Sequence, residues 1–499
     1  MLHWLEMFGV TKHSHLGQLR NSGHWSALVT LILGFACLIC SCGSAPTRSP
    51  RKKPNVLLVV MDTVRADSLS YAGYDRKTSP TLDRLAEQSY VFTQAVSVGG
   101  NTPTAMAGIM TGRWSHYRMD PDWTAEQWTP RAWFGMERFY RSDEELGIPT
   151  ATPALAERLS MAGYTTAGYI NNAYLKRGFH FDRGFDRYDD TFRKNGRVPY
   201  GHGEDATAEA IEFLESNQDL PFFLYVHYMD AHAPYRPPEP FRSKFLDSDK
   251  DLGDTPELVK RFDTGLKPDD ADAEEITAHM RAVYDGSIAF IDDCIGQVLE
   301  AVEEAGQADN TIVVVTADHG EEFFEHGRTG HKGGLYEEIV RVPLLIYVPW
   351  AAGGTVDQSV RNFDLMPTIL ELAEVDGGSE LDAVSLTGVI RNQSSERELS
   401  TFASFPWRRM LRGQRYKLVE SHTGRAELYD LLRDPAEQQD LMANQESQSR
   451  VAGIAGAMLR ELALLDKGLA SGASPRVTGD EAEVGQETLE QLRTLGYIK

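Results

Sequence analysis

The sequence contains few cysteines, and their positions exclude two common kinds of site. Four of the 499 residues are cysteines, and Cys37, Cys40 and Cys42 lie together in a short apolar stretch near the start. The remaining one, Cys294, has no cysteine partner in the body of the chain, so neither a disulfide framework nor a zinc–thiolate site can form there. Its place on a predicted helix is typical of a small buried apolar residue rather than a reactive thiol.

Basic residues are also scarce relative to acidic ones. The chain has 50 lysines and arginines against 73 aspartates and glutamates, and its formal net charge is -23. A protein this acidic has no general attraction to nucleic acid, so nucleic acid is not an expected partner. An anionic substrate would need a local cation that reverses the field around it.

The N-terminal apolar stretch, residues 27–40, is too short for a membrane-spanning helix, which needs about 20 residues. Its length is typical of the hydrophobic region of a signal sequence, and Lys12 and Arg20 precede it. Residues 38–43, Leu-Ile-Cys-Ser-Cys-Gly, resemble a bacterial lipobox. This resemblance would make Cys42 the lipidated first residue of the mature chain.

Basic residues after this stretch favour the opposite orientation, because positive charge is retained on the cytoplasmic side. These residues are Arg48, Arg51, Lys52 and Lys53. We give the lipobox-like sequence more weight because it is the more specific signal. Residues 1–53 are therefore interpreted as a signal or lipoprotein segment with a linker, whether cleaved or retained. We expect an exported protein, anchored at the membrane in the cell envelope or periplasm.

From residue 54 onward, short apolar runs alternate with amphipathic helical stretches, which is the pattern of an α/β fold. The near-continuous apolar character of the runs is typical of strands buried on both faces of a parallel sheet. The predicted strands are 55–60, 165–170, 222–228, 311–316 and 343–348. Helices are predicted at 79–86 and at 285–304, the second from an apolar stripe at three- and four-residue steps.

The pattern changes near residue 395, where shorter strands and a polar helical stretch begin. We predict a catalytic domain over residues 54–395, a smaller C-terminal α+β subdomain over 396–475 and a polar helical tail over 476–499. Two segments are interpreted as insertions: residues 114–145 are rich in tryptophan, and residues 240–275 are acidic and polar. Each is either a surface loop or a lid that shapes substrate choice.

Polar residues follow four of the predicted strands, at the edge where ligands bind in an open α/β sheet. They are Asp62, Asn171 and Asn172, His232, and Asp318 with His319. A single carboxylate after a strand is more often a helix cap or a turn residue. Two carboxylates and two imidazoles in one chain instead favour a divalent-metal site.

The stretch from Gly99 to Met106 combines glycines with a Thr-Pro pair before a run that is compatible with a helix. We expect Thr102 to be the N-cap and Pro103 the first helical residue. Thr102 is then either an ordinary cap or a hydroxyl at a helix N-terminus, where free N–H groups favour an anion. In the second case a metal-coordinated hydroxyl could attack a phosphorus or sulfur centre.

Several ordered motifs resemble the sulfatase family of the alkaline phosphatase superfamily. Residues 55–67, through Asp62 and Arg65, resemble the family's opening strand and first metal ligand, and residues 317–321 resemble its second metal-binding loop. The resemblance extends to the segments that carry an active-site histidine and a substrate-binding lysine, and to downstream landmarks. These stretches are 229–235, 325–343, 364–368 and 427–435, so the likeness runs from 54 to about 441.

The resemblance implies an alkaline-phosphatase-like α/β/α sandwich with a large, mostly parallel sheet. It also implies one divalent metal ion (Ca, Mg, Mn or Zn), held by Asp62, Asp318 and His319 with Thr102 completing the shell. His232 would protonate the leaving oxygen. The other implied contacts to substrate are Lys332 and His331, which neutralise oxygens, the donor Asn172, and Arg65 and His326, both of which also suit a structural or surface role.

The chain departs from the family at the nucleophile. Sulfatases carry a cysteine or serine that is oxidised to formylglycine, and Thr102 stands in its place but cannot be converted in that way. Met106 replaces an expected arginine, Tyr169-Ile170-Asn171-Asn172 stands where Gly-Lys-Trp-His is expected, and Thr63 replaces a second aspartate. Threonine nucleophiles do occur in relatives that transfer phosphoethanolamine or glycerophosphate.

We therefore predict a metal-dependent hydrolase of sulfate or phosphate esters with a metal-activated threonine. One alternative is a phosphodiesterase or phosphoethanolamine-type phosphotransferase that acts on cell-envelope glycans or lipids. Another is a non-catalytic, sulfatase-like binding protein, although a lapsed site has no reason to keep metal ligands. The expected partner is a small anionic ester, glycan or lipid.

Overall fold

The computed structural model describes residues 52–117, 133–134, 147–190, 202–217, 220–253, 256–331, 333–391, 400–405, 407–443 and 445–471. The predicted lipidation residue Cys42, the predicted substrate lysine Lys332 and the predicted tail lie outside these residues. The chain divides into two units, Met1–Arg51 and Lys52–Lys499, and the elements described here belong to the second. In the part of the chain that is described, no helix combines the length and hydrophobicity needed to cross a bilayer.

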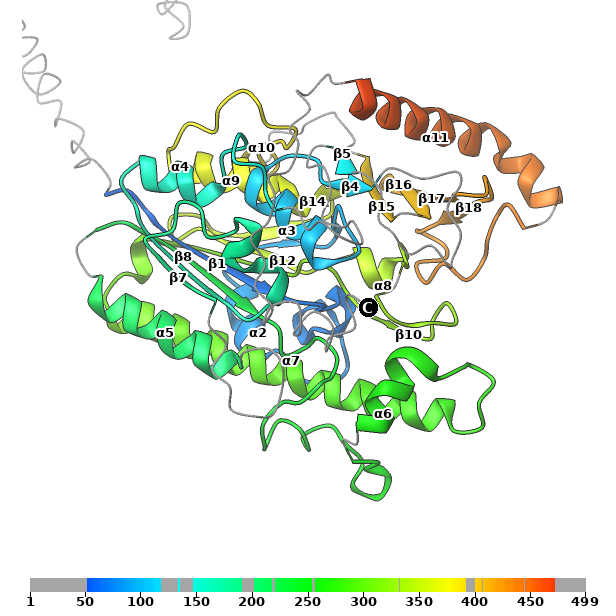
Figure 1. Cartoon of the computed structure of the whole chain (residues 1–499), viewed down its shortest axis with the longest axis horizontal. Coiled ribbons are helices and arrows are strands. Elements are labelled where there is room, and N and C mark those ends of the chain that lie inside the picture. Colours follow the sequence, from blue (N-terminus) through cyan, green and yellow to red (C-terminus); the bar gives the residue numbers. More distant parts are fainter. Residues whose placement is uncertain are drawn as a thin grey trace, which may run out of the picture. The chain divides into compact units, whose positions relative to one another are not determined.

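An eight-stranded sheet with the order β13-β2-β12-β9-β1-β8-β6-β7 forms the centre of this unit (Figure 1). Its strands are β1 (Asn55–Met61), β2 (Tyr90–Phe92), β6 (Thr165–Ile170), β7 (Arg187–Asp189), β8 (Phe222–Tyr228), β9 (Thr311–Thr316), β12 (Leu344–Tyr347) and β13 (Gly354–Val356). The five predicted strands are confirmed within one or two residues. The strand predicted at 343–348 runs antiparallel to β9, so the sheet is mixed on that side.

The central strands β9, β1, β8 and β6 run parallel to one another. Every residue of β1, β8 and β9 is buried, which explains why their sequences are almost continuously apolar. Val59 of β1, for example, lies between Val226 of β8 and Val315 of β9. Because parallel strands end at the same edge of a sheet, the residues that follow these four strands are gathered at one place.

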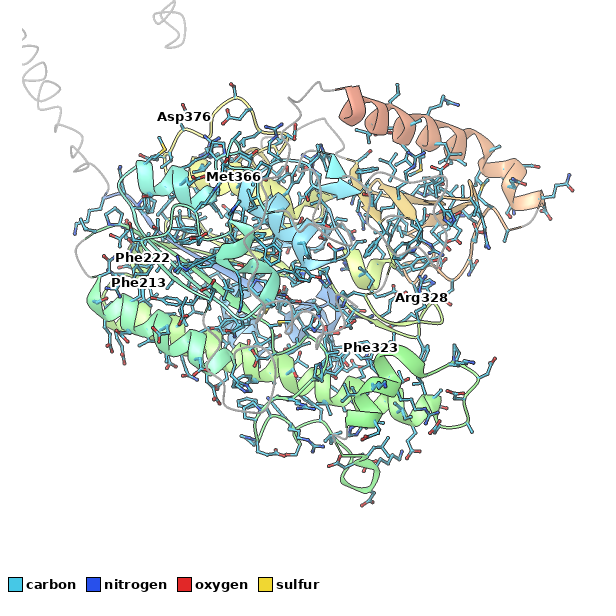
Figure 2. The ribbon with its side chains drawn as sticks, in the orientation of Figure 1. Phe213, Phe222, Phe323, Arg328, Met366 and Asp376 are labelled. Atoms are coloured by element: carbon cyan, nitrogen blue, oxygen red, sulfur yellow. The ribbon has the colours of Figure 1, made fainter. Side chains whose placement is uncertain are left out.

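Helices cover both faces of the sheet. On one side, α7 (Ala273–Glu304) packs against α5 (Gly203–Ser216) and α2 (Pro80–Ala86), and α5 packs onto β8 and β6. Phe213 of α5 meets Phe222 of β8 edge-on with ring centroids 5.9 Å apart, and Figure 2 shows this contact at the end of the sheet. On the other side, α3 (Thr102–Thr111) contacts α4 (Leu155–Met161) and α9 (Leu365–Leu372).

The helix α7 begins at Ala273, well before the predicted start at residue 285. Its buried stripe continues through Ile276, Met280 and Val283, which alternate with charged residues that concealed the periodicity. The segment 240–275 therefore includes the start of a helix as well as α6 (Pro256–Lys260), rather than a loop alone. Cys294 on α7 is buried, as predicted.

A four-stranded antiparallel sheet with the order β15-β16-β17-β18 forms the smaller C-terminal region. Its elements are β15 (Thr401–Phe405), β16 (Arg408–Arg412), β17 (Tyr416–Ser421), β18 (Ala426–Asp430) and the packed helix α11 (Gln445–Ser471). The remaining elements are β3 (Ala95–Val96), β4 (His116–Tyr117), β5 (Trp133–Phe134), β10 (Glu322–Phe323), β11 (Thr329–Gly330), β14 (Val360–Arg361), α8 (Glu337–Val340) and α10 (Thr387–Ile390).

Buried charges connect this small sheet to α8. Arg412 and Lys417 both pair with Glu337, at 2.9 Å and 3.1 Å, and Lys417 also pairs with Glu437 at 3.0 Å. The side chain of Lys417 is completely buried, so these carboxylates are what make its charge tolerable. The network fixes the C-terminal region against the segment that precedes β12.

Trp114, the first residue of the predicted tryptophan-rich insertion, belongs to the core rather than to a lid. It is buried between Phe363 and Phe402, with ring centroids 4.6 Å and 6.0 Å away. Arg361 lies over its ring at 5.4 Å. The segments 118–132 and 135–146 of that insertion lie outside the described residues, so its predicted role as a lid stays a prediction.

Candidate active site

The carboxyl ends of the four central strands bring together five buried polar residues. Asp62 follows β1, Asn172 follows β6, His227 is the penultimate residue of β8, and Asp318 and His319 follow β9. All five have a relative exposure of 0%. Polar side chains buried to this degree need hydrogen bonds, a counter-charge or a metal ion, and their contacts show which atoms have found partners.

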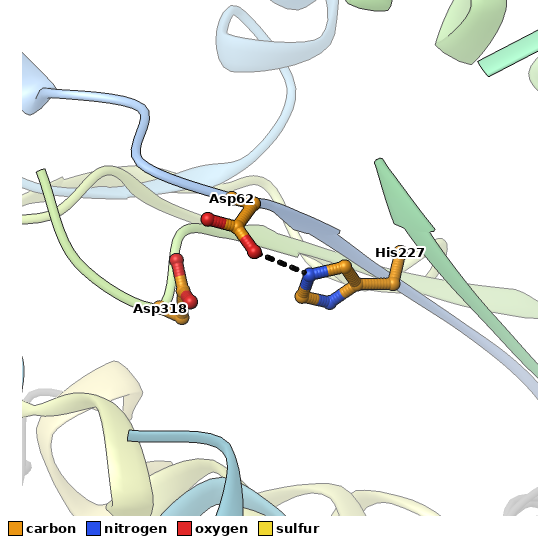
Figure 3. A group of neighbouring side chains, drawn as sticks. All are labelled: Asp62, His227 and Asp318. Carbon is orange, nitrogen blue, oxygen red and sulfur yellow. Dashed lines mark hydrogen bonds and ion pairs between the residues drawn. The ribbon is translucent and has the colours of Figure 1, made fainter. Parts of the chain in front are cut away.

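The two oxygens of Asp62 have different surroundings. Its Oδ2 accepts hydrogen bonds from His227 Nε2 at 3.0 Å and from Asn172 Nδ2 at 2.6 Å. Its Oδ1 has no hydrogen-bond partner in the described part of the chain, although it is buried. Figure 3 shows the bond from His227, with Asp318 on the other side of the Asp62 carboxylate.

Asp318 shows the same division between its two oxygens. Its Oδ1 accepts the backbone N–H groups of Thr63 at 3.1 Å and of His319 at 2.8 Å. Its Oδ2 accepts no hydrogen bond from any residue that the structure describes. One ligand atom each from Asp62, His227 and Asp318 lie within 4.8 Å of one another. Each aspartate thus offers one unsatisfied oxygen, which is the arrangement that a cation would satisfy.

His319 is oriented as metal-binding histidines usually are. Its Nδ1 donates to the Gly320 carbonyl at 3.0 Å, which leaves the lone pair of the neutral ring on Nε2. That Nε2 lies 3.4 Å from Asp318 Oδ2 and 3.4 Å from Thr102 Oγ1. A ligand from each of these side chains can therefore point into one small volume.

The electrostatics of the cluster also favour a bound positive charge. Burial raises the pKa of Asp318, and the charge of Asp62 raises it further. For Asp62, burial acts upward, but the hydrogen bond from His227 and the surrounding imidazoles outweigh it and lower the pKa. Burial lowers the pKa of His319, and the two carboxylates outweigh that effect and raise it. A cation between the aspartates would replace the protons that this site otherwise attracts.

Thr102 presents its hydroxyl to this cluster. Its Oγ1 lies 3.4 Å from Asp62 Oδ2, from His319 Nε2 and from Asn172 Nδ2. The prediction that Thr102 caps the helix is wrong. The N-cap of α3 is Asn101, whose extended backbone and side-chain acceptor hold the N–H of Thr104 at 3.1 Å. Because asparagine performs the capping, the Thr102 hydroxyl remains directed towards the acids and imidazoles.

Two further predicted histidines lie next to this group. The His331 ring is 4.5 Å from the His319 ring and 4.9 Å from the His232 ring, measured between centroids. His331 Nδ1 lies 3.3 Å from Glu321 Oε1, and His232 Nδ1 donates to the Ala233 carbonyl at 2.6 Å. Burial and the neighbouring His331 lower the pKa of His232 to about 4. His232 is therefore neutral near pH 7, so it must gain a proton before it can act as an acid.

Arg65, predicted as a substrate contact, is engaged in ion pairs with two carboxylates. It contacts Asp67 at 2.7 Å and Glu325 at 2.5 Å, and it donates to the Glu321 carbonyl at 3.1 Å. Burial disfavours its charge, but the two carboxylates outweigh burial and raise its pKa well above the ordinary value. These contacts give Arg65 a structural role in holding the residues on either side of β10.

His326, also predicted as a substrate contact, belongs to a different cluster. Its ring stacks on Tyr336 with centroids 3.6 Å apart, and its Nε2 lies 3.2 Å from Glu338 Oε1. Glu437 completes a second group whose potential ligand atoms lie within 4.8 Å of one another. The Lys417 ammonium, 3.0 Å from Glu437, already supplies a positive charge there. Lys417 therefore balances the charge of Glu437 without a metal ion.

His227 is the site residue that sequence reasoning missed. The sequence pattern predicts an apolar buried strand here, because Val226 and Tyr228 flank the histidine. Its position beside Val60 places it one step before the end of β8, level with the end of β1. The available signal was a histidine near the end of a strand that is buried on both faces. A buried histidine needs a polar partner, so it indicates a polar site nearby.

Comparison with known families gives an extended match. The family model described as Sulfatase matches residues 54–375, which is more than half of the chain. A second model, described as N-sulphoglucosamine sulphohydrolase, C-terminal, matches residues 325–463. The second match covers the small antiparallel sheet and most of α11.

Individual proteins show the same likeness. The chain is 25% identical to an arylsulfatase of Clostridium perfringens, over 84% of this chain and 96% of that protein. A solved structure in complex with D-glucosamine-2-N,6-O-disulfate has a TM-score of 0.63 and 22% identity, and covers 85% of this chain and 99% of its own. The phosphonate monoester hydrolase of Agrobacterium radiobacter has a TM-score of 0.63 and 21% identity, with 83% and 96% coverage.

Proposed function

Because the chain belongs to the sulfatase family, we propose that it is a metal-dependent hydrolase of sulfate or phosphate esters with Thr102 as the nucleophile. The observation that carries the proposal is the position of the Thr102 hydroxyl, 3.4 Å from both Asp62 and His319. Asp62 and Asp318 each have a carboxylate oxygen without a hydrogen-bond partner among the described residues, and His319 has a lone pair on Nε2. These three atoms suit a cation. The proposed nucleophile therefore lies next to the proposed metal ligands.

One divalent cation would be held by Asp62 Oδ1, Asp318 Oδ2 and His319 Nε2, with the Thr102 hydroxyl beside it. When bound, it would lower the pKa of that hydroxyl and polarise an oxygen of the substrate. The imidazole is a ligand that suits zinc, whereas the two carboxylates suit magnesium, manganese and calcium as well.

The surrounding residues then bind and orient the ester. Asn172 donates to Asp62 and lies 3.4 Å from Thr102 Oγ1, so its amide can also face a substrate oxygen. His232 and His331 stand beside His319 and supply imidazoles for proton transfer to the leaving oxygen. We assign Lys332, which follows His331 directly, to the neutralisation of substrate oxygens by its place in the family motif.

A phosphodiesterase or phosphotransferase activity is the second candidate, and the identity of the nucleophile favours it. Threonine cannot form the aldehyde hydrate of sulfatases, so turnover must pass through an ordinary threonine ester that a second acceptor cleaves. Met106, in the place of the expected arginine, is fully buried and apolar. A structural neighbour is named as a phosphonate monoester hydrolase, which is compatible with phosphorus chemistry on this fold.

The deciding experiment measures metal content and turnover together. The purified chain should bind close to one divalent metal and hydrolyse at least one of an aryl sulfate, an aryl phosphate and a bis-aryl phosphate. Thr102→Ala should abolish turnover and keep the metal. Thr111→Ala is the matched control, because Thr111 lies on the same helix and donates to the Ala107 carbonyl instead.

Each outcome of this experiment distinguishes the candidates. Hydrolysis of the sulfate ester alone contradicts phosphoryl transfer. A folded chain that binds no metal and turns over nothing supports a binding protein. Full activity in Thr102→Ala removes Thr102 as the nucleophile and directs attention to Thr104, although its hydroxyl is held by Asn101 at 2.5 Å.

We further propose that the enzyme is exported and held at the membrane through Cys42. The support is the lipobox-like sequence around that residue, followed by the linker that leads to β1. An envelope location would expose the site to esters of glycans and lipids.

A further inference from the structure

We propose that His227 and Tyr225 form a buried positioning pair that fixes the Asp62 carboxylate, so His227 acts through Asp62 and does not itself bind the cation. This inference rests on the proposed function, because Asp62 matters only as a metal ligand. It assigns a role to two residues of β8 that neither the family resemblance nor the sequence pattern had singled out.

The contacts form an unbroken chain of hydrogen bonds. His227 Nε2 lies 3.0 Å from Asp62 Oδ2, and His227 Nδ1 lies 2.9 Å from Tyr225 Oη. Tyr225 and His227 are two residues apart on one strand and therefore project from the same face. The three side chains are at most 1% exposed, so water does not compete for these bonds.

The chemistry of the two ends fixes which nitrogen carries the proton. Asp62 Oδ2 also accepts a hydrogen bond from the Asn172 amide, which can only donate, so this carboxylate oxygen acts as an acceptor. His227 must then carry its proton on Nε2 and accept on Nδ1. Burial raises the pKa of Tyr225 well above its ordinary value, so its hydroxyl keeps the proton that it donates to Nδ1.

This arrangement determines how Asp62 can bind a cation. Oδ2 is occupied by the bonds from His227 and Asn172, whereas Oδ1 has no partner among the residues described. Asp62 is therefore presented as a one-oxygen ligand whose free atom is Oδ1. A histidine that orients a ligand in this way typically contributes about 10–100-fold to metal affinity.

Direct binding of the cation by His227 requires the opposite tautomer. In that case Nε2 would carry no proton, and Nδ1 would donate to Tyr225 Oη. The hydrogen bond from His227 to Asp62 Oδ2 at 3.0 Å uses the proton on Nε2, so that nitrogen has no free lone pair for a cation, although it lies within 4.8 Å of ligand atoms of Asp62 and Asp318. His319 provides a contrast, since its Nδ1 donates to a backbone carbonyl and its Nε2 lone pair is available.

The first test reads the tautomer directly. Nitrogen-15 NMR of the histidine-labelled full chain, with His227→Gln used for assignment, should show the Nε2–H form both without metal and with one equivalent of Zn²⁺. A His227 signal that changes to Nδ1–H, with a metal-bound Nε2, on addition of Zn²⁺ overturns the proposal. The measurement needs no turnover, so an inactive enzyme does not affect it.

The second test measures Zn²⁺ affinity by calorimetry. His227→Leu should weaken binding by about 10–100-fold. His227→Gln should restore most of the loss, because its amide can donate to Asp62, and Tyr225→Phe should weaken binding by a few-fold. Tyr228→Phe is the matched control, because Tyr228 is an equally buried residue of β8 whose hydroxyl bonds Thr207 at 2.9 Å.

The outcomes separate this inference from the proposed function. If the wild-type chain binds none of Zn²⁺, Mn²⁺ and Mg²⁺, the proposed function fails, while the tautomer in the metal-free chain still tests the pair. If His227→Leu binds Zn²⁺ as tightly as the wild type, the positioning role is wrong even though the enzyme is active. If His227→Leu does not fold, Tyr225→Phe and the NMR experiment still test the proposal.

Discussion

Replacing Asp318 by asparagine should stabilise the metal-free protein and abolish its response to metal. The Oδ1 atom, which accepts the N–H groups of Thr63 and His319, is present in both side chains. The Oδ2 atom accepts no hydrogen bond from any described residue, and in the variant it becomes an amide NH₂ close to the Asp62 carboxylate. A repulsive pair is thereby replaced by a donor and an acceptor.

The size of the effect follows from the separation of the charges. The ligand oxygens of Asp62 and Asp318 lie within 4.8 Å of each other. At that distance two unit charges repel by about 3.5 kcal/mol at an effective dielectric constant of about 20. Burial and the charge of Asp62 raise the pKa of Asp318, which is the direction that such a repulsion produces. We expect the free energy of unfolding to rise by about 1–3 kcal/mol.

Urea unfolding in the presence and absence of metal measures both consequences. In EDTA, Asp318→Asn should unfold at higher urea than the wild type. With Mn²⁺ or Zn²⁺ at about 100 times its dissociation constant, the wild type should gain about 2.7 kcal/mol and the variant should gain almost nothing. The stability advantage of Asp318→Asn over the wild type should therefore shrink or reverse when metal is added.

A matched control separates the metal-site effect from the loss of any buried carboxylate. Asp292 is also buried and also accepts two backbone N–H groups, from Thr81 at 2.8 Å and Leu82 at 2.9 Å, but it uses both oxygens. Asp292→Asn should destabilise the chain with and without metal and keep the metal response. If Asp318→Asn is less stable than the wild type in EDTA, Asp318 is a structural acid and the reasoning about the site is refuted.

Two other predictions concern parts of the chain outside this pair. Burial raises the pKa of Glu338 to about 8, above its unfolded value near 4.3, so its contribution to stability is present at low pH and is lost as the pH rises towards 8. Glu338→Gln should flatten the fall in urea midpoint between pH 5 and pH 8, and an unchanged slope contradicts this. In a bacterial host, Cys42→Ser should lose lipid labelling and membrane association while Cys40→Ser keeps both; a membrane-bound Cys42→Ser protein contradicts the lipobox assignment.

The strands and the two aspartates proposed as metal ligands could be predicted because burial determines the local residue pattern. Strands buried on both faces must be apolar throughout, and a carboxylate that follows such a strand is visible without any knowledge of the fold. Asp62 and Asp318 were found in this way. The direction of β12 was not predictable, because the same apolar run suits a parallel or an antiparallel neighbour.

Contacts between distant residues explain most of what the sequence could not show. Whether Arg65 faces a substrate depends on Glu325, which is 260 positions away and neutralises it. The N-cap was placed at Thr102 because threonine and proline form a familiar pair, whereas Asn101 is the stronger cap and takes the position. His227 was hidden because a single imidazole does not change the apolar character of a strand.

The shortage of cations around Thr102 bears on which ester the enzyme accepts. Where sulfatases carry an arginine, a lysine and a histidine, this chain has Met106, which is buried, Ile170 and the neutral amide of Asn172. Phosphate monoesters carry up to two negative charges near pH 7, whereas sulfate monoesters and phosphodiesters carry one. With fewer fixed cations, a monoanion loses less stabilisation than a dianion.

The two monoanionic substrates, the sulfate monoester and the phosphodiester, differ in how the threonine ester is cleaved. A phosphorylated threonine can be released by a second attack at phosphorus. Sulfatases avoid such an attack at sulfur, because their aldehyde hydrate releases the sulfate. We therefore expect bis-aryl phosphate to be turned over faster than aryl phosphate. Faster turnover of aryl phosphate, the dianionic monoester, would contradict this expectation. It would show that other cations compensate for the missing ones, and Lys332 would be the first of them to test.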